Sequence, residues 1–382
     1  MELVKFMNAH KKDWQKILSA EPYNIKISSA PAINGAYYLL KYNQLSSDFN
    51  LAFCREARGC IMYFDNLTQR FECVCHPFDK FGNYGESYVP EIDWKSAKVT
   101  EKVDGSLIKV WYHGGWHIST NGTIDAHYAH LQNGSMSYYD LFLRAIRKHG
   151  AVEDFFRALD LRYTYLFELV SPDNRMTIYY PEDAIYLIGK RNNLTHAETK
   201  ITPFCKTNFD IYYSSLGVRI PRAYSLASLE ECIEATKAMG ADEEGFVVCD
   251  ANFNRVKVKS EQYLIASHLR FNNSINVKKV IKLIREEMID DFCAYNEDYI
   301  GFVNSIKEMG RTIVAEMECD WNVFDAMNIA TKKDFYMAVK NSPYCDFLCK
   351  RYDGKYCITA KEWLDRLSID EITERIEEAL NG

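Results

Sequence analysis

The alternation of apolar and polar positions changes near residue 275 and divides the chain into two regions. Before this point, short runs rich in aromatic and β-branched residues predict strands. These runs cover residues 36–42, 59–64, 70–75, 107–113, 116–120, 163–170, 176–180, 184–188, 245–249 and 255–259. Gly114 and Gly115 predict a hairpin turn between two of them. Residues 140–148 and the segment between Ser228 and Gly240 predict helices in the same region.

After residue 275 the apolar positions follow a helical period. The predicted helices cover residues 277–290, 299–318, 321–340, 361–367 and 371–380. Two capping boxes support the last two, Thr359 with Glu362 and Ser368 with Glu371. We therefore predict an α+β domain at residues 1–273, followed by an all-helical domain at residues 274–382.

Composition narrows the class of protein. Hydrophobic residues make up 47% of the 382 positions and charged residues 26%, which is typical of a globular protein and excludes a disordered chain. Since no run of 18 apolar residues is present and the first residues are polar, we expect no membrane span, no secretory signal and a cytoplasmic protein. Twelve cysteines without framework spacing are expected to be reduced thiols.

The tightest group of metal-binding residue types is Cys73, Cys75 and His76. A zinc site needs four ligands, and no second pair lies at a suitable spacing. Because Cys73 and Cys75 alternate in a predicted strand, we expect the two thiols simply to share a face.

The net charge of −7 argues at first against a nucleic-acid binder. However, residues 278–382 contain 15 basic and 21 acidic side chains, so almost all of the negative charge lies in the predicted helical domain. The preceding domain is close to neutral. We expect its cations at Arg55, Arg58, Lys80, Lys102 and the lysines of residues 257–259 to converge on one locally positive pocket.

Four short motifs follow one another at regular intervals. The chain has K-x-D-G at residues 102–105, F-E-L at 167–169, E-G-F-V at 244–247 and K-x-K at 257–259. This order resembles motifs I, III, IV and V of the covalent nucleotidyltransferases, the superfamily of DNA ligases, RNA ligases and mRNA capping enzymes.

The residue types suit the chemistry that this resemblance implies. A lysine amine attacks the α-phosphorus of a nucleoside triphosphate only when it is neutral, and nearby cations favour the neutral form. Lys257 and Lys259 alternate along a predicted strand, so both face one way and can act on Lys102 and bind the α-phosphate. Magnesium prefers carboxylate and phosphate oxygens, which suits Glu244.

Further residues narrow the resemblance to the T-even phage RNA ligase 1 family, over roughly residues 36–270. These are Arg58-Gly59, then P-x-x-K-F-x-N at residues 77–83, Ser106 after K-x-D-G, S-x-x-N-R at residues 171–175, and Ser260, Tyr263 and His268 after K-x-K. The resemblance implies a nucleotidyltransferase domain of ATP-grasp-like antiparallel sheets with helices, followed by a helical C-terminal domain.

The resemblance also implies a function. Members of the family use ATP and Mg²⁺, with Mn²⁺ as a substitute, to join a 3′-hydroxyl to a 5′-phosphate in RNA, and they repair broken tRNA. A phage-encoded monomer acting in the host cytoplasm is the corresponding expectation. Lys102 would be the nucleophile, assisted by Lys257 and Lys259, and Glu244 the metal ligand. Among the nucleotide-binding residues, Glu168 would accept the ribose hydroxyls, and Arg58 and Lys80 would hold the distal phosphates. The full expected set is Tyr42, Arg58, Lys80, Glu101, Lys102, Glu168, Glu244, Lys257 and Lys259.

Two positions depart from the family pattern. The family prototype has an aromatic residue where this chain has Gly82, and a lysine in the segment after motif I where this chain reads Ser119-Thr120-Asn121-Gly122, with Asn121 as the candidate site residue. Triphosphate or RNA-end contacts are therefore expected to differ there.

Two other functions are compatible with parts of the pattern. A DNA ligase or a GTP-dependent capping enzyme normally continues into a small β-barrel, whereas this chain continues into predicted helices. A catalytically silent RNA-binding protein would be expected to lose Lys102 or one of the lysines of K-x-K, and both motifs are intact.

Overall fold

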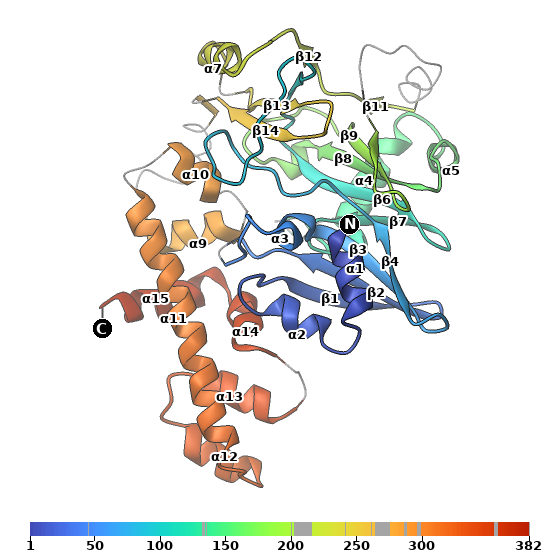
Figure 1. The fold of residues 1–382 in the computed structure, drawn as a ribbon. Helices are drawn as coiled ribbons and strands as arrows, with labels where there is room; N and C mark the ends of the chain where they lie inside the picture. The colour runs from blue at the N-terminus through green and yellow to red at the C-terminus, as the bar shows by residue number, and fades with distance from the viewer. Residues whose placement is uncertain are drawn as a thin grey trace. The chain divides into compact units, whose positions relative to one another are not determined.

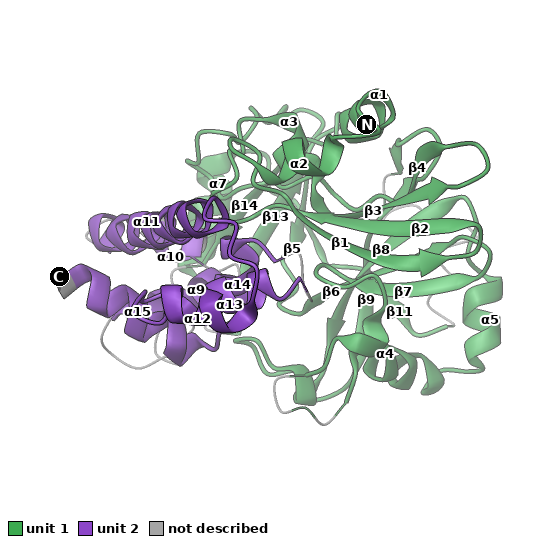
Figure 2. Ribbon diagram, turned by 90° about the horizontal axis from the view of Figure 1, so that it is seen from below, with its two compact units in different colours: residues 1–270 green, residues 271–382 purple. Residues whose placement is uncertain are grey.

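The computed structural model describes residues 1–381 except 45, 132–133, 135, 200, 202–215, 241, 261, 264–275, 286–288, 296–298 and 355–357. The chain divides into two compact units, Met1–Arg270 and Phe271–Gly382 (Figure 2). The first unit holds antiparallel sheets with helices and the second is helical (Figure 1), which confirms the predicted fold class. The predicted domain boundary at residue 273 lies outside the described residues, so that boundary remains a prediction.

The first sheet has the order β1-β2-β3-β4 and is antiparallel throughout. Its strands are β1 (Lys26–Ala32), β2 (Gly35–Lys41), β3 (Arg58–Asp65) and β4 (Arg70–Cys75), accompanied by α1 (Glu2–Ala9), α2 (Trp14–Ser19) and α3 (Ala52–Glu56). Side chains such as Leu3, Trp14 and Leu40 form a core between this sheet and the N-terminal helices.

The second sheet follows the order β10-β9-β8-β6-β7, and β11 pairs with β9. Its strands are β6 (Ser106–Tyr112), β7 (Trp116–Thr120), β8 (Tyr163–Val170), β9 (Ala184–Asn192), β10 (Glu198–Thr199) and β11 (Val218–Arg219). Helices α4 (Tyr138–Arg147) and α5 (Val152–Arg157) pack against it through an apolar core. Trp111 of β6 is fully buried against Tyr37, Leu39 and Ile61 of the first sheet, so the two sheets share a core.

The third sheet, of order β12-β5-β13-β14, carries the motif residues. It consists of β5 (Lys98–Glu101), β12 (Ala223–Tyr224), β13 (Gly245–Cys249) and β14 (Arg255–Lys259), with α7 (Leu229–Lys237) packed on its apolar side. K-x-D-G therefore connects the third sheet to the second, because it follows β5 and precedes β6.

The second unit consists of helices around one apolar core. They are α9 (Val277–Arg285), α10 (Ile289–Tyr295), α11 (Ile300–Asp325), α12 (Lys332–Val339), α13 (Cys345–Tyr352), α14 (Ala360–Arg366) and α15 (Ile369–Asn381). The Thr359–Glu362 capping box is present in full. Within the described ranges, none of the helices combines the length and apolar character that crossing a bilayer requires.

Three expectations from the sequence were wrong. Residues 176–180 form no strand, because the backbone N–H groups of Thr177 and Ile178 donate to the Asp104 carboxylate instead of to a neighbouring strand. In the second unit, α11 continues to Asp325, past the break expected near residue 320, and the helix expected at residues 321–340 is interrupted between Asp325 and Lys332. A register shift between β3 and β4 places Cys73 and Cys75 in different apolar clusters, so the two thiols do not share a face.

Candidate active site

Lys102 lies directly after β5, and its backbone N–H donates to the carbonyl of Gly245 at 2.8 Å. This bond fixes the lysine beside the start of β13, where the E-G-F-V motif begins. The Lys102 Nζ donates to Glu244 Oε2 at 2.8 Å, and 21% of the Lys102 side chain is exposed. The lysine is therefore both paired and accessible.

Glu244 connects two lysines. Its Oε1 lies 2.8 Å from the Nζ of Lys259, and only 2% of its side chain is exposed. The backbone of Ser260 donates to the Glu244 carbonyl, which aligns the end of β14 with the start of β13. One buried carboxylate thus neutralises one of two ammonium groups, and the cluster retains a net positive charge.

Strand β14 presents its cations on one face, as period 2 requires. Val256 and Val258 enter the apolar core under α7, while Arg255, Lys257 and Lys259 point the other way. The Lys257 Nζ lies 5.2 Å from the centre of the Phe81 ring.

Arg58, the arginine of the Arg58-Gly59 motif, also lies over the Phe81 ring. Its guanidinium carbon lies 5.6 Å from the centre of Phe81. Its Nη1 is buried and has no hydrogen-bond partner among the described residues. Since buried polar groups are nearly always satisfied, an unsatisfied guanidinium nitrogen is suited to an anionic ligand.

Glu168 lies deep in the second sheet, on β8. Burial raises the pKa of its carboxyl to about 7, against the opposing effect of Lys102. Its Oε1 accepts a hydrogen bond from the backbone of Gly105 at 3.2 Å. The K-x-D-G turn therefore sits directly on the F-E-L strand.

Asp104 ties two further segments to the same turn. Its Oδ2 accepts the two backbone N–H groups of residues 177 and 178 at 2.8 Å each, and its Oδ1 accepts the Tyr263 hydroxyl at 3.0 Å. Tyr263 also lies under the Lys259 ammonium, 5.3 Å from the ring centre. The aspartate of K-x-D-G thus organises the segment after K-x-K, where His268 lies outside the described residues.

The serine after K-x-D-G has a defined partner. Asn174 Nδ2 donates to Ser106 Oγ at 2.9 Å, and the Tyr138 hydroxyl donates to Asn174 Oδ1 at 3.1 Å. Ser171 donates to Asp183 Oδ1 at 2.7 Å, and Asp183 is also paired with Arg144. The S-x-x-N-R segment therefore holds the K-x-D-G turn in place through these hydrogen bonds. The spacing of the motif in the sequence does not show this role.

Lys80 and Tyr42 belong to one buried group. The Lys80 Nζ lies 5.2 Å from the Tyr42 ring and 4.8 Å from the Phe49 ring, and it donates to Gln44 Oε1 at 3.3 Å. Both Tyr42 and Lys80 are buried. The carboxylate of Glu101, in contrast, accepts the backbone N–H of Arg222 at 3.0 Å and so holds the edge strand β12.

The glycine of the Arg58-Gly59 motif is explained by a close approach. Gly59 has φ +74°, and a Cβ at this position would lie 2.6 Å from the carbonyl oxygen of Asn121. The fully buried Lys109 of β6 donates from Nζ to the carbonyl of Gly59, and burial lowers the pKa of Lys109. The side-chain nitrogen of Lys109 thus lies beside the glycine that Asn121 also approaches.

The space beside Gly82 is filled by its own loop. A Cβ there would lie 2.3 Å from Glu86 Oε2, 2.7 Å from Val89 and 2.9 Å from the Tyr88 ring. An aromatic residue at this position would require these side chains to move.

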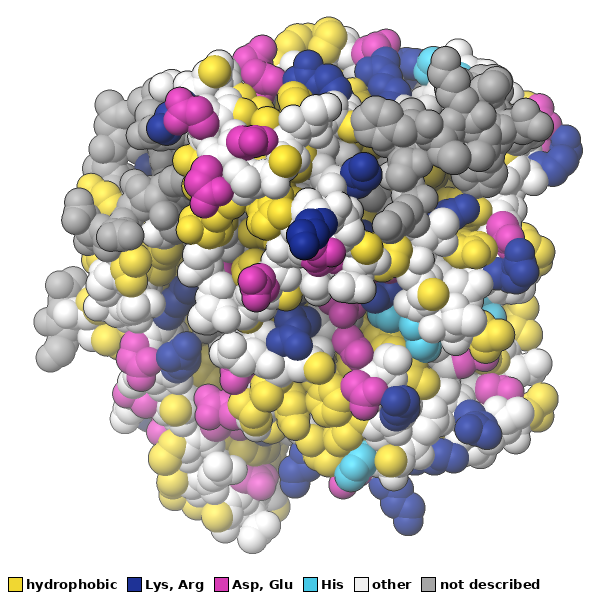
Figure 3. Space-filling view, turned by 45° about the horizontal axis from the view of Figure 1, so that its top comes forward, with side chains coloured by type: hydrophobic (Ala, Val, Ile, Leu, Met, Phe, Trp, Pro, Cys, Tyr) yellow, Lys and Arg dark blue, Asp and Glu magenta, His cyan; other side chains and the backbone are white. Residues whose placement is uncertain are grey.

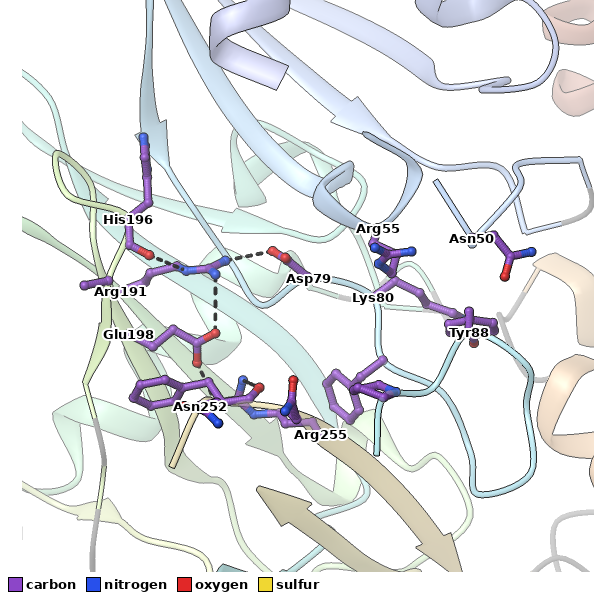
Figure 4. A pocket seen from close by; sticks show the side chains of 15 residues that line it. Asn50, Arg55, Asp79, Lys80, Tyr88, Arg191, His196, Glu198, Asn252 and Arg255 are labelled. Atoms are coloured by element: carbon purple, nitrogen blue, oxygen red, sulfur yellow. Dashed lines mark hydrogen bonds and ion pairs between the residues drawn. The ribbon is translucent and has the colours of Figure 1, made fainter. Parts of the chain in front are cut away.

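A cavity of about 690 Å³ lies at the edge of this region (Figure 4). Arg55 and Lys80 line it, as does Phe81, which carries Arg58 and Lys257 on its ring. Its opposite wall is an ion-pair chain in which Asp79, Arg191, Glu198 and Arg255 alternate in charge. Only two of the cations expected to converge therefore line this cavity.

On the face drawn in Figure 3, the Lys and Arg side chains of the described residues are scattered among acidic and apolar ones.

Comparison with known proteins identifies the class. A family model described as RNA ligase matches residues 56–263, more than half of the chain, so the chain belongs to the RNA ligase family. The matching model is that of T4 RNA ligase 1, as the motifs implied.

Two relatives extend the match. An RNA ligase of Rhodothermus phage RM378 is 27% identical over 340 residues, covering 75% of this chain and 76% of that protein. A protein of Autographa californica nuclear polyhedrosis virus, provisionally assigned as a bifunctional polynucleotide kinase/RNA ligase, is 30% identical over 276 residues, covering 67% of this chain. This chain spans only 37% of the length of that viral protein. A solved archaeal ATP-dependent RNA ligase superposes with a TM-score of 0.45 and 15% identity, covering 82% of each chain.

Proposed function

We propose that this protein is an ATP-dependent RNA ligase that uses Lys102 as its nucleophile. The observation that carries the proposal is the Lys102–Glu244–Lys259 cluster, in which a partly exposed lysine lies beside a second ammonium group. Membership of the RNA ligase family supports it.

The reaction has three in-line displacements. The Lys102 Nζ, after losing a proton, attacks the α-phosphorus of ATP; a P–N bond forms, and the P–O bond to pyrophosphate breaks. A 5′-phosphate oxygen of RNA then displaces the lysine and takes the AMP. Finally a 3′-hydroxyl attacks the 5′-phosphorus, loses its proton, and releases AMP. Such steps depend on positioning and on charge stabilisation more than on covalent assistance.

The remaining site residues are assigned to binding. Lys259 and Lys257 would hold the α-phosphate, Glu168 the ribose, and Arg58, through its unsatisfied nitrogen, the distal phosphates. Lys80 and Tyr42 would form the adjoining wall, and Glu101 would act only by fixing the strand before Lys102.

A divalent metal, Mg²⁺ or Mn²⁺, would fit Glu244. Each carboxylate oxygen accepts from one lysine and keeps a second lone pair that an ion could bind. Loss of the Lys102 positive charge on adenylylation would make Oε2 still more available to the ion. The bound ion would offset charge on the phosphoryl oxygens.

Radiolabelled nucleotide tests the proposal. The purified chain is incubated with α-labelled ATP or GTP and Mg²⁺, and then separated on a denaturing gel. We expect label from ATP on the wild type and on Lys98→Ala, an exposed lysine on β5, and none on Lys102→Ala. Label from GTP alone would indicate a capping enzyme, and label from neither nucleotide a silent RNA-binding protein; either result contradicts the proposal.

The natural substrate is a further part of the proposal. We assign broken tRNA as the RNA, and a monomer in the cytoplasm of a phage-infected host as the acting form, on the strength of the family resemblance. Sealing of nicked tRNA in preference to nicked DNA, and elution as a monomer in size-exclusion chromatography, are the expected results.

A further inference from the structure

Three metal-ligating side chains meet at one point on the first unit, away from the Lys102 cluster. Cys73 lies on β4, His76 follows that strand directly, and His196 lies in the turn between β9 and β10. One ligand atom from each residue lies within 4.8 Å of the other two. Cys73 and His76 are buried and His196 is half-buried.

The two imidazoles face each other through their Nδ1 atoms, which are 3.2 Å apart. Two nitrogens bound to one tetrahedral zinc at about 2.0–2.1 Å are about 3.3–3.4 Å apart. The observed separation is therefore close to that of a zinc-bound pair. A zinc-bound sulfur at about 2.3 Å would lie about 3.6 Å from each nitrogen, so the Cys73 sulfur, within 4.8 Å of a ligand nitrogen of each histidine, has to approach by up to about 1.2 Å.

The backbone holds His196 in this position. Its φ of +61° lies in the left-handed region, which few residues other than glycine adopt. The Asn192 side chain accepts the backbone N–H groups of Leu194 and Thr195, and the Asn192 carbonyl accepts that of His196. A tight turn is thus built so that the His196 ring points at His76.

The outer shell can accommodate a metal after a local change. Arg191 Nη1 donates to His76 Nε2 at 2.9 Å, which places the His76 hydrogen on Nδ1. Asp79 Oδ1 lies 3.7 Å from the same Nε2 and is not hydrogen-bonded to it. A metal on Nδ1 would move the hydrogen to Nε2, so Arg191 would have to turn away from Nε2 and Asp79 would have to approach it, which would give the carboxylate–histidine–metal arrangement common in zinc sites. The other bonds of Arg191, to Asp79 and to the Pro77 carbonyl, are both 2.8 Å.

A cavity borders the site. His196, Asp79 and Arg191 line the cavity of about 690 Å³ drawn in Figure 4. The cavity thus borders the outer shell of the three side chains.

From these contacts we propose that Cys73, His76 and His196 bind one Zn²⁺ ion, with water as the fourth ligand. Binding releases the thiol proton of Cys73 to solvent, shifts one proton between the nitrogens of His76, and changes no oxidation state. The ion clamps the end of β4 to the β9–β10 turn. The proposal does not depend on the RNA ligase activity.

Metal analysis of the intact chain tests the site. We expect one zinc per chain after dialysis against trace Zn²⁺. Co²⁺ in its place should give visible d–d bands of tetrahedral strength and a near-ultraviolet thiolate-to-cobalt band. The thiolate band should disappear in Cys73→Ser and persist in Cys75→Ser, whose thiol packs in a different cluster.

Histidine variants test the same metal site in case Cys73→Ser fails to fold. His196→Ala alters a half-buried turn residue and should weaken Co²⁺ binding more than tenfold, whereas His130→Ala, an exposed histidine, should not change it. Asp79→Asn should weaken binding by about 10- to 100-fold through the outer shell. No stoichiometric Zn²⁺ or Co²⁺ binding by the wild type, or equal binding by His196→Ala, would overturn the proposal.

Discussion

Replacing Glu168 with glutamine removes a carboxyl that folding makes difficult to ionise. The substitution nearly preserves shape and keeps an acceptor for the Gly105 N–H. Its effect on the free energy of unfolding should depend on pH, because burial raises the pKa of Glu168 from 4.5 in the unfolded chain to about 7 in the folded protein.

The direction of this pH dependence follows from the difference between the pKa values of Glu168 in the folded and unfolded states. A carboxyl whose pKa is higher in the folded state contributes its full stabilisation below about pH 4.5 and loses it as the pH rises through about 7. Between about pH 5.5 and about pH 8.5 this loss amounts to about 2 kcal/mol for the wild type. The figure is an upper limit, because the side chain keeps partial contact with solvent.

Urea unfolding of wild type and Glu168→Gln at both pH values measures the effect. Taking the difference between the two proteins at each pH cancels every other titrating group. We expect the difference to change by up to about 2 kcal/mol in favour of the variant as the pH rises. The exposed Glu91→Gln serves as the control and should show no such change. If wild type and Glu168→Gln have parallel pH dependences, the assignment of a raised pKa to Glu168 is wrong.

The other predictions concern backbone, charge and packing. Gly59→Ala should lower the free energy of unfolding in urea by at least about 2 kcal/mol, because both its φ and the close neighbours oppose a Cβ. Gly114→Ala has a similar φ but open space, so it should cost only about 1 kcal/mol, and equal costs for the two variants would contradict the argument. Lys109→Met should slow self-adenylylation about tenfold, and adding Asn121→Lys should restore the rate if the ammonium is what matters; no recovery would point to packing instead. Phe347→Ala should cost about 3–5 kcal/mol in the helical unit, measured as a shift of its urea transition, and a cost below about 1 kcal/mol would show that the core relaxes.

Local sequence patterns were sufficient where the contacts are local. Period 2 placed Lys257 and Lys259 on one face of a strand, and the structure shows the same alternation on β14. The hairpin at residues 114–115 and the capping box at Thr359 depend on neighbours in the chain, and both are present.

Contacts between distant segments could not be predicted. His196 reaches His76 across 120 positions, and Lys109 reaches Gly59 across 50, because the first and second sheets pack face to face. No spacing rule connects these residues. The missing strand at residues 176–180 has the same origin, since the Asp104 carboxylate, 73 positions earlier, takes the backbone N–H of Thr177.

The two ion pairs of Glu244, with Lys102 and Lys259, affect how the charge at this site changes during the proposed reaction. In the empty protein the group carries one surplus positive charge. When the proposed first step attaches AMP to Lys102, one ammonium disappears and a phosphate anion arrives, so the same buried point becomes surplus negative. The summed charge of Glu244 and its two lysines thus changes sign at this step. The affinity of Glu244 for a divalent cation should therefore be higher after the first step than before it, without any change of fold.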